Sequence, residues 1–312
     1  MSLDDRTSPR APDPRRPTAA DWLAAPTRAG GHDLELLGVP RFAGSVAASS
    51  AHATPAAVRR ALAGLTTFAP SRGVDVAGLK ALDRGDVPDP DGEEGEWRVR
   101  MAAVTAATAA RLVVGLGGDA SVTPPLVDGV CGASISSTGV VLVGPQYDLR
   151  AGRTSASGAH WLLELGVPAQ RIVQVGLADW ADSASYVGMA RELGIRTFPA
   201  GMVEQRGMAA VMSDALDLAA GANGPVCVSL DLGVADSAVV PGCRRALPGG
   251  LSASAVRDAA HAAGRDARVV AATLVEVDPA LDPDGRTVRL AALCLLELAA
   301  GLVVRDDALA RT

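Results

Sequence analysis

Five acidic residues follow apolar runs of the sequence, at the points where buried strands are expected to end. They are Asp119, Asp148, Asp231, Asp236 and Glu276. Carboxylates that converge in a partly buried cleft usually hold a cation or bind a cationic substrate. For any single aspartate the alternative is N-capping of the helix that follows it. Capping explains one such residue better than five at successive strand ends, so the pattern favours a site for a cation or a cationic ligand.

Histidine is scarce, which limits the acid–base and metal chemistry that the chain can support. The sequence contains only His32, His52, His160 and His261. His160 lies twelve residues after Asp148, where it is either a general acid–base group or a residue on a helix surface. The four cysteines form no Cys-x-x-Cys pair and indicate no zinc site. Cys227 and Cys294 lie in apolar runs typical of buried thiols.

The elements that must position these residues alternate between strands and helices. Strands are expected at the short apolar runs Leu34–Val39, Val140–Val143, Ile172–Val175, Ile195–Phe198, Val226–Leu230 and Val269–Val275. Such runs suit inner strands of a parallel sheet that is covered by helices on both faces. Helices are expected at Trp97–Leu112, Gly158–Leu165, Tyr186–Leu193, Met208–Ala220 and Val288–Val304. This alternation predicts a doubly wound α/β fold, whose ligands lie beyond the carboxyl ends of the strands.

Composition excludes several classes of protein. The 312 residues are 48% hydrophobic and 21% charged, which excludes disorder over most of the chain. The net charge of −6 argues against a general nucleic-acid binder. The longest apolar stretch, Leu290–Val304, contains Glu297 and is too short to span a bilayer. We therefore expect a soluble cytoplasmic protein with neither a nucleic-acid nor a membrane partner.

Two further features concern domain organisation and cofactors. Residues 1–30 are rich in arginine and proline and are expected to form a flexible tail before a single domain at residues 31–306. The segment Gly115–Ala120 fits a loose dinucleotide-binding pattern. That pattern requires an acidic residue about 20 positions later, and Gly139–Val143 contains none. A nicotinamide or flavin site is therefore disfavoured.

The strand ends resemble the signatures of the ureohydrolase family, which includes arginase, agmatinase and formimidoylglutamase. Members carry Gly-Gly-Asp-His-Ser, Asp-x-His-x-Asp and Ser-x-Asp-x-Asp-x-x-Asp in that order, and the resemblance runs from about Leu36 to Val304. It rests on Gly38–Pro40, Thr54–Arg59, Gly117–Asp119, Pro241–Gly242, Gly249–Leu251 and Glu276–Pro279. Gln174–Leu177, Glu276–Asp282 and Thr287–Ala292 look most like formimidoylglutamase. The resemblance implies a three-layer, single-domain arginase-like fold with a mostly parallel central sheet, assembled as a trimer or hexamer.

The resemblance breaks at the metal ligands. Family enzymes bind two Mn²⁺ ions through two histidines and four aspartates, and the matching positions here are Ala120, Gly144, Gln146, Asp148, Asp231 and Gly233. Only Asp148 and Asp231 keep a carboxylate. We therefore expect no tightly bound cofactor, with a single weakly held Mg²⁺ or Mn²⁺ as the alternative. Without a metal pair, no bound water has its pKa lowered from about 15.7 toward about 7, and the hydroxide nucleophile is lost.

The two remaining carboxylates need another source of compensation. Buried acids at close range share a proton, bind a weak cation or meet an arginine. Arg150 and Arg153 are the nearest arginines in the sequence to Asp148. By resemblance, Glu276 matches the acidic residue that pairs with a guanidinium or amidinium group. A small cationic amidine or guanidine ligand is thus expected to bind at Glu276 and Asp148, with His160 and Asp236 as the catalytic candidates.

Three hypotheses for function follow. The first is a non-hydrolytic family member, a pseudoenzyme that serves as a binding, regulatory or assembly partner. The second is an enzyme that acts on a linear amidine or guanidine C–N bond through an altered or single-metal site. The third is a conventional formimidoylglutamase, agmatinase or arginase activity. In each case the resemblance implies a homo-oligomer, or a mixed oligomer with an active paralogue.

Overall fold

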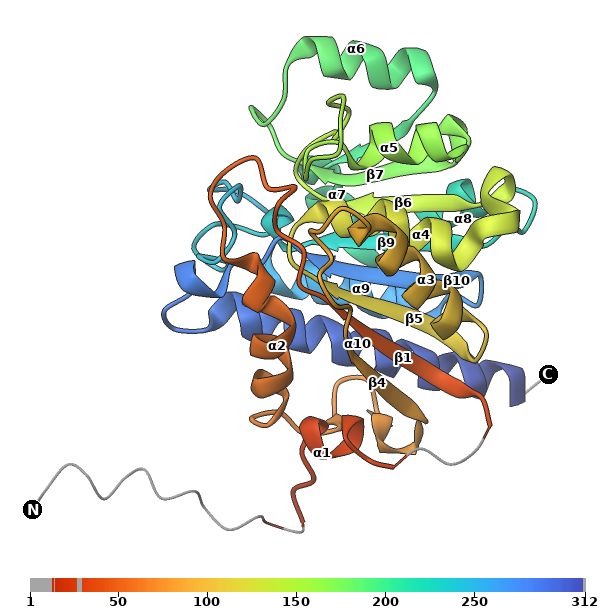
Figure 1. Ribbon diagram of the computed structural model, residues 1–312, viewed down its shortest axis with the longest axis vertical. Coiled ribbons are helices and arrows are strands. Elements are labelled where there is room, and N and C mark those ends of the chain that lie inside the picture. Colours follow the sequence, from red (N-terminus) through yellow and green to blue (C-terminus); the bar gives the residue numbers. More distant parts are fainter. Residues whose placement is uncertain (1–12, 14, 27–29, 311–312) are drawn as a thin grey trace, which may run out of the picture.

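A central eight-stranded sheet organises the protein (Figure 1). The computed structural model describes residue 13 and residues 15–26 and 30–310. The strands are β1 (His32–Val39), β4 (Ala81–Asp86), β5 (Ala110–Gly117), β6 (Gly139–Val143), β7 (Ile172–Leu177), β8 (Arg196–Pro199), β9 (Val226–Asp231) and β10 (Val269–Val275). Their spatial order is β4-β1-β5-β10-β9-β6-β7-β8, and every neighbouring pair is parallel. A short antiparallel pair, β2 (Phe68–Ala69) and β3 (Val74–Asp75), lies apart from the sheet.

Helices cover both faces of the sheet and so give the expected three layers. One face carries α2 (Thr54–Leu62), α7 (Ala200–Arg206), α8 (Met208–Ala220), α9 (Ala253–Arg265) and α10 (Arg286–Ala310). The other carries α3 (Gly95–Ala107), α4 (Thr123–Cys131), α5 (Gly158–Leu165) and α6 (Ala184–Leu193). Each layer has its own apolar core, because the inner strands bury side chains on both faces. The predicted fold class is confirmed.

Most of the predicted elements are present, with corrections at their ends. The helix expected at Trp97–Leu112 ends at Ala107, since the chain turns there and enters β5 at Ala110. The edge strand β4 was not predicted, because its sequence Ala-Leu-Asp-Arg-Gly-Asp lacks an apolar run. A parallel edge strand exposes part of its length to solvent, and only the first residue of β4 is buried.

The segment expected to be a flexible tail contains a packed helix. Residues 1–12, 14 and 27–29 lie outside the described residues, so flexibility there stays a prediction. Helix α1 (Ala19–Leu23) begins with a capping box between Thr18 and Asp21. Trp22 is buried, and its indole N–H donates to the carbonyl of Leu79 at 3.1 Å. This part of the segment is therefore anchored to the domain.

Helix α10 is the longest of the described helices. Among the described residues it is the one helix long and apolar enough to span a membrane, over Arg286–Arg305. Yet 72% of its apolar window is buried inside the protein. Its buried Glu297 lies 3.0 Å from the Nε of Arg72 and bonds Arg257. These contacts are those of a core helix packed between α2 and α9.

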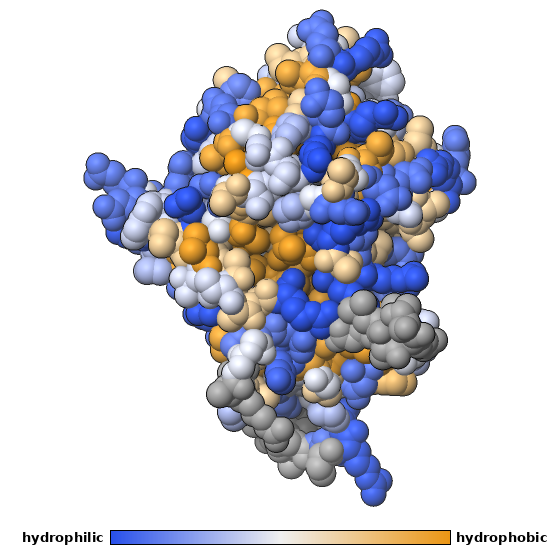
Figure 2. Space-filling view, turned by 90° about the vertical axis from the view of Figure 1, so that its right-hand side faces the viewer, coloured by the Kyte–Doolittle hydropathy of each residue, from blue (hydrophilic) through white to orange (hydrophobic). Residues whose placement is uncertain are grey.

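The carboxyl ends of four adjacent strands, β5, β10, β9 and β6, meet at one edge of the sheet. Figure 2 views the opposite side, where the strands begin, and shows hydrophobic residues near the centre of a largely hydrophilic face.

The chain after β5 must pass very close to its neighbours, since a Cβ at Gly118 would lie 1.8 Å from the carbonyl oxygen of Arg41. Glycine is therefore required there, and it allows Asp119 to reach the edge.

Candidate functional site

Three carboxylates from three adjacent strand ends form the centre of the site. Asp231 is the last residue of β9, Glu276 directly follows β10, and Asp148 follows β6. Their side chains are 7%, 14% and 13% exposed, respectively. The parallel order of the strands brings them together although 128 positions separate Asp148 from Glu276 in the sequence. We refer to Asp148, Asp231 and Glu276 as the carboxylate cluster.

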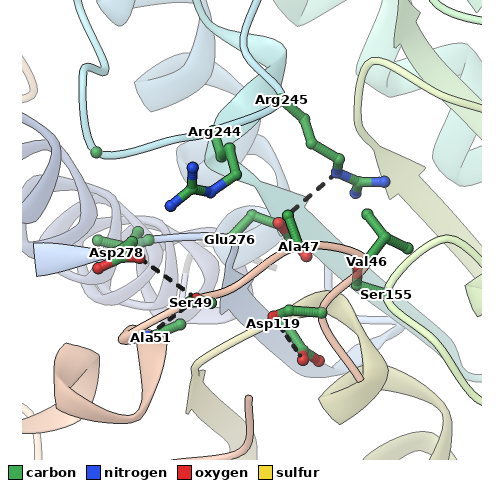
Figure 3. Close-up of a pocket in the computed structure, with 13 residues that line it drawn as sticks. Val46, Ala47, Ser49, Ala51, Asp119, Ser155, Arg244, Arg245, Glu276 and Asp278 are labelled. Atoms are coloured by element: carbon green, nitrogen blue, oxygen red, sulfur yellow. Dashed lines mark hydrogen bonds and ion pairs between the residues drawn. The ribbon is translucent and has the colours of Figure 1, made fainter. Parts of the chain in front are cut away.

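The guanidinium of Arg245 lies within the carboxylate cluster (Figure 3 shows it beside Glu276). Its Nη2 is 3.1 Å from Oδ2 of Asp231, its Nη1 is 3.5 Å from Oδ1 of Asp148, and its Nε is 3.7 Å from Oε2 of Glu276. Arg245 belongs to the segment between β9 and α9, which folds back across the strand ends. Only 13% of the Arg245 side chain is exposed.

One guanidinium does not neutralise three carboxylates, and the pKa values reflect this. Burial raises the pKa of Asp148 to about 7, against an opposing effect of Arg245 and a further increase from Glu276. Burial likewise raises the pKa of Glu276 to about 7 and that of Asp231 to about 6. Burial lowers the pKa of Arg245, but the three acids outweigh it and raise that pKa overall. Near neutral pH the carboxylate cluster therefore shares protons as well as a guanidinium.

Asp148 and Glu276 are held in an unusual backbone conformation. Their φ angles are +49° and +64°, in the left-handed region that residues other than glycine seldom adopt. The amide of Glu276 donates to Gly118 at 2.8 Å, and its carboxylate accepts the amide of Ala120 at 2.9 Å. The carbonyl of Asp148 accepts the amides of Ala159 and His160, at the start of α5. Surrounding elements thus fix both carboxylates in place.

Gln146 links Arg245 to the loop after β7. Its Oε1 accepts from Nη1 of Arg245 at 2.6 Å, and its Nε2 donates to the carbonyl of Ala181 at 3.0 Å. The same loop contributes Asp182, which accepts the amide of Tyr147 at 2.7 Å. It also carries Trp180, whose side chain is 99% exposed. Gln146 therefore acts as a positioning residue for Arg245.

A small pocket lies against the cluster. Its volume is about 50 Å³, and its lining includes Asp119, Ser155, Arg244, Arg245 and Glu276. The segment Ser45–Ala51 runs along it (Figure 3), and its Ser49 hydroxyl bonds Asp278. Small-molecule pockets usually measure about 300–1,000 Å³. The space left beside Arg245 therefore suits a few waters rather than an amino-acid substrate.

Capping, the alternative role of the strand-end acids, occurs at three of them, and one is Asp231, whose side chain accepts the amide of Gly233. Asp236 is half-buried and accepts the amides of Ala238 and Gly249 at 2.8 and 2.7 Å, which lowers its pKa. Asp119 is buried and accepts from Ser121 and Ser45. Asp119 still lines the pocket, whereas Asp236 does not. The structure thus brings three of the five acids together and leaves Asp236 outside.

His160 lies on α5 rather than in the pocket. Its Nε2 is 3.2 Å from Oε1 of Glu164, one helical turn away, and a third of the side chain is exposed. Arg153 also pairs with Glu164 and stacks on Trp161 at 4.6 Å from its centroid. Arg150 is exposed. The arginine that contacts the three acids is Arg245. It was not predicted, because the sequence contains many arginines and no motif distinguishes this residue from the others.

The positions matched to metal ligands do surround the cluster. A Cβ on Gly144 would lie 3.4 Å from Cβ of Asp231, so a side chain there would face that carboxylate. The amide of Gly233 donates to Asp231 at 2.7 Å. Ala120 donates its amide to Glu276. Gly233 and Ala120 thus contribute backbone donors to the acids, and none of the three residues offers a side-chain ligand.

Comparison with known proteins places the chain in a family. Residues 32–301 match the arginase family. The chain is 32% identical to the formimidoylglutamase of Halobacterium salinarum over 306 residues, which cover 94% of this chain and 97% of that protein. The structure of Bacillus subtilis formimidoylglutamase has a TM-score of 0.85 at 22% identity, with 96% of each chain covered. That of Trypanosoma cruzi formiminoglutamase with Mn²⁺ has a TM-score of 0.83 at 24% identity, covering 93% of this chain and 99% of the other.

This comparison corrects the prediction about cofactors. We expected no tightly bound cofactor, with a weak single Mg²⁺ or Mn²⁺ as the alternative. That expectation is contradicted, because the Trypanosoma cruzi protein of the same fold holds Mn²⁺. The side chains of this chain nevertheless do not fit a metal pair. Among the described residues no group of three or more His, Cys, Asp or Glu could hold a metal ion, and Arg245 lies between the acids.

The family match over most of the chain, the relative at 32% identity and the shared fold agree with one another. The chain belongs to the arginase family of ureohydrolases and resembles its formimidoylglutamases.

Proposed function

We propose that this chain is a non-hydrolytic member of the arginase family that acts as a binding, regulatory or assembly partner. The observation that carries the proposal is the position of the Arg245 guanidinium, within 4 Å of all three acids of the carboxylate cluster. A cationic amidine or guanidine substrate would need the same carboxylates and would have to displace Arg245. The pocket beside Arg245, of about 50 Å³, supports the same conclusion.

Hydrolysis of an amidine also requires an activated water. The described residues that face the pocket offer carboxylates, serine hydroxyls and two arginines, but no histidine. The carboxylates that could act as a base already pair with the Arg245 guanidinium, which lies between them. The arrangement therefore favours binding over turnover.

The test is a substrate panel. N-formimidoyl-L-glutamate, agmatine and arginine are each incubated with the purified protein, with and without added Mn²⁺, beside Bacillus subtilis formimidoylglutamase as the active control. We expect formamide and urea to stay at the level of the protein-free blank, while the control releases formamide. Sustained product release by this chain in any arm would refute the proposal.

A second candidate function is hydrolysis of a linear amidine C–N bond at an altered site. It is favoured by the pKa values of Asp148 and Glu276, both raised by burial to about 7, where a carboxyl group can exchange protons at neutral pH. Turnover of this kind would survive a chelator and would be abolished in Asp231→Ala. His160 and Asp236 would not be required for it.

Assembly and location follow the same proposal. We propose a homo-oligomer, a trimer or hexamer, or a mixed oligomer with an active paralogue, in the cytoplasm and without a nucleic-acid partner. Light scattering gives the mass of the purified assembly. Co-expression with a tagged, active family member tests whether mixed oligomers form.

A further inference from the structure

Two of the four cysteines contact each other at a place in the fold that the proposed function does not use. Cys227 is the second residue of β9, near the end of the strand opposite to Asp231, and Cys131 is the last residue of α4. Their Sγ atoms are 3.5 Å apart, although 96 positions separate them in the sequence. Both side chains are buried, and neither cysteine is in a disulfide. The thiol of Cys243, by contrast, donates to the carbonyl of Glu276 at 2.9 Å.

The two cysteines differ in how far their sulfur atoms can move. Cys227 lies inside the sheet, where Val140 of β6 and Ala271 of β10 flank it on its two sides. Cys131 precedes the turn Gly132–Ser137, in which no residue is buried. The sulfur atoms of a disulfide are about 2.05 Å apart, so the pair must close by about 1.5 Å. Because Cys131 stands at a helix end beside a surface turn, it can supply most of this movement.

Cys131 is also the better nucleophile of the two. A hydrogen bond with Cys227 lowers the pKa of Cys131 against the opposing effect of burial, and Thr138 lowers it further. The same contact and burial raise the pKa of Cys227 well above its ordinary value. The thiolate is the form of cysteine that reacts with oxidants. Cys131 is therefore expected to react first, and Cys227 is the neighbouring thiol that can complete the reaction.

We propose that Cys131 is a site of oxidation by hydrogen peroxide and that Cys227 converts the product into an intramolecular disulfide. The thiolate of Cys131 attacks one peroxide oxygen, the O–O bond breaks, and a sulfenic acid and a hydroxide ion form. The sulfur of Cys227 then attacks the sulfenic sulfur, the S–O bond breaks, and the departing hydroxide takes the thiol proton. Two thiols lose two electrons to one peroxide, and the products are one disulfide and two waters.

The disulfide would fix the end of α4 against β9. Helix α4 begins at Thr123, shortly after Asp119 of the pocket, and β9 ends at Asp231 of the carboxylate cluster. Oxidation would thus cross-link two elements that both lead to the site. The inference does not depend on the proposed function, because it is measured by counting thiols and not by turnover.

The test exposes the reduced full-length protein to a few equivalents of hydrogen peroxide and removes the excess with catalase. The protein is then unfolded in guanidinium chloride, its free thiols are counted with a chromogenic disulfide reagent, and a non-reducing digest is analysed by mass spectrometry. The variants are Cys131→Ala and Cys227→Ala. Cys294→Ala is the matched control, because Cys294 is also buried but forms no hydrogen bond with another thiol among the described residues.

We expect the wild-type chain to fall from four free thiols to two, and Cys294→Ala to fall from three to one. The digest should contain one linked pair of peptides that carries Cys131 and Cys227, and dithiothreitol should restore all the thiols. In Cys227→Ala, dimedone, which labels sulfenic acids, should mark Cys131. In Cys131→Ala, loss of the Cys227 thiol should be at least tenfold slower than in the wild-type chain.

Three results would overturn the proposal. The first is a wild-type chain that keeps all four thiols at a peroxide dose that fully oxidises a short cysteine peptide. The second is a disulfide that includes Cys243 or Cys294, or that joins two chains. The third is an equal rate of thiol loss in the wild-type chain and in Cys131→Ala.

Discussion

Replacing Asp148 with asparagine should make the protein more stable at alkaline pH. The pKa of Asp148 is raised from 3.8 to about 7 by burial, so the folded chain binds a proton there more tightly than the unfolded chain does. The contribution of the Asp148 carboxyl to the free energy of unfolding is fully present below about pH 4 and is lost as the pH rises toward 7. Asparagine has the shape of the protonated acid and never ionises. The free energy of unfolding of Asp148→Asn should therefore not decrease through ionisation at this position.

The magnitude follows from the two pKa values. The difference between 3.8 and about 7 corresponds to about 4 kcal/mol at 1.36 kcal/mol per pKa unit. Roughly a third of this is already lost near pH 5, since the unfolded aspartate is ionised there. Between pH 5 and pH 8 the free energy of unfolding of the wild-type chain should thus fall by about 3 kcal/mol more than that of Asp148→Asn.

The assay is urea denaturation of both chains near pH 5 and near pH 8, in buffers of equal ionic strength. Asp214→Asn is the control, because Asp214 lies on the surface and pairs only with Arg206 among the described residues. The control should follow the wild-type pH dependence within about 0.5 kcal/mol. If Asp148→Asn is no more stable than the wild-type chain near pH 8, the charge analysis of the cluster is wrong.

Three further predictions concern packing and charge. Trp22→Ala should lower the free energy of unfolding by about 3 kcal/mol, because Trp22 is buried. Trp180→Ala, at a fully exposed side chain, should change it by less than about 0.5 kcal/mol, and equal effects of the two substitutions would contradict the anchoring of α1. Glu297→Gln should cost about 2 kcal/mol in urea denaturation, because it leaves two arginines without their buried acid, and a neutral result would refute that pairing. Gly144→Asp should lower the melting temperature near pH 8 more than near pH 5, since it adds a carboxylate beside Asp231; an equal shift at both pH values would contradict this.

The fold was predictable because its strands are unambiguous. Runs such as Val140–Val143 are apolar on both faces, and only inner strands of a covered sheet bury such a run. The edge strand β4 escaped prediction because one side of an edge strand is solvated and its sequence is polar. The buried residues of α1 were not predicted, because a helix of five residues is too short for a helical period of apolar residues to appear in the sequence.

The site was predictable only in part. Asp148, Asp231 and Glu276 were expected at one sheet edge because parallel strands bring their ends together. Asp236 looked equivalent in sequence but caps a turn, since its loop leads the side chain toward backbone amides instead of the pocket. Arg245 depends on how a long connection folds back across the sheet, which no local pattern encodes.

The left-handed backbone of Asp148 and Glu276 has a consequence for how variants of this protein would be selected. Each such residue costs about 1 kcal/mol or more relative to glycine, out of a typical total of about 5–15 kcal/mol. Directed evolution for heat resistance alone should therefore drift toward glycine at both positions and would delete two of the three acids. A screen that also rewards ligand binding should keep them. Comparing the outcomes of the two screens would separate what these side chains contribute to binding from what they cost the fold.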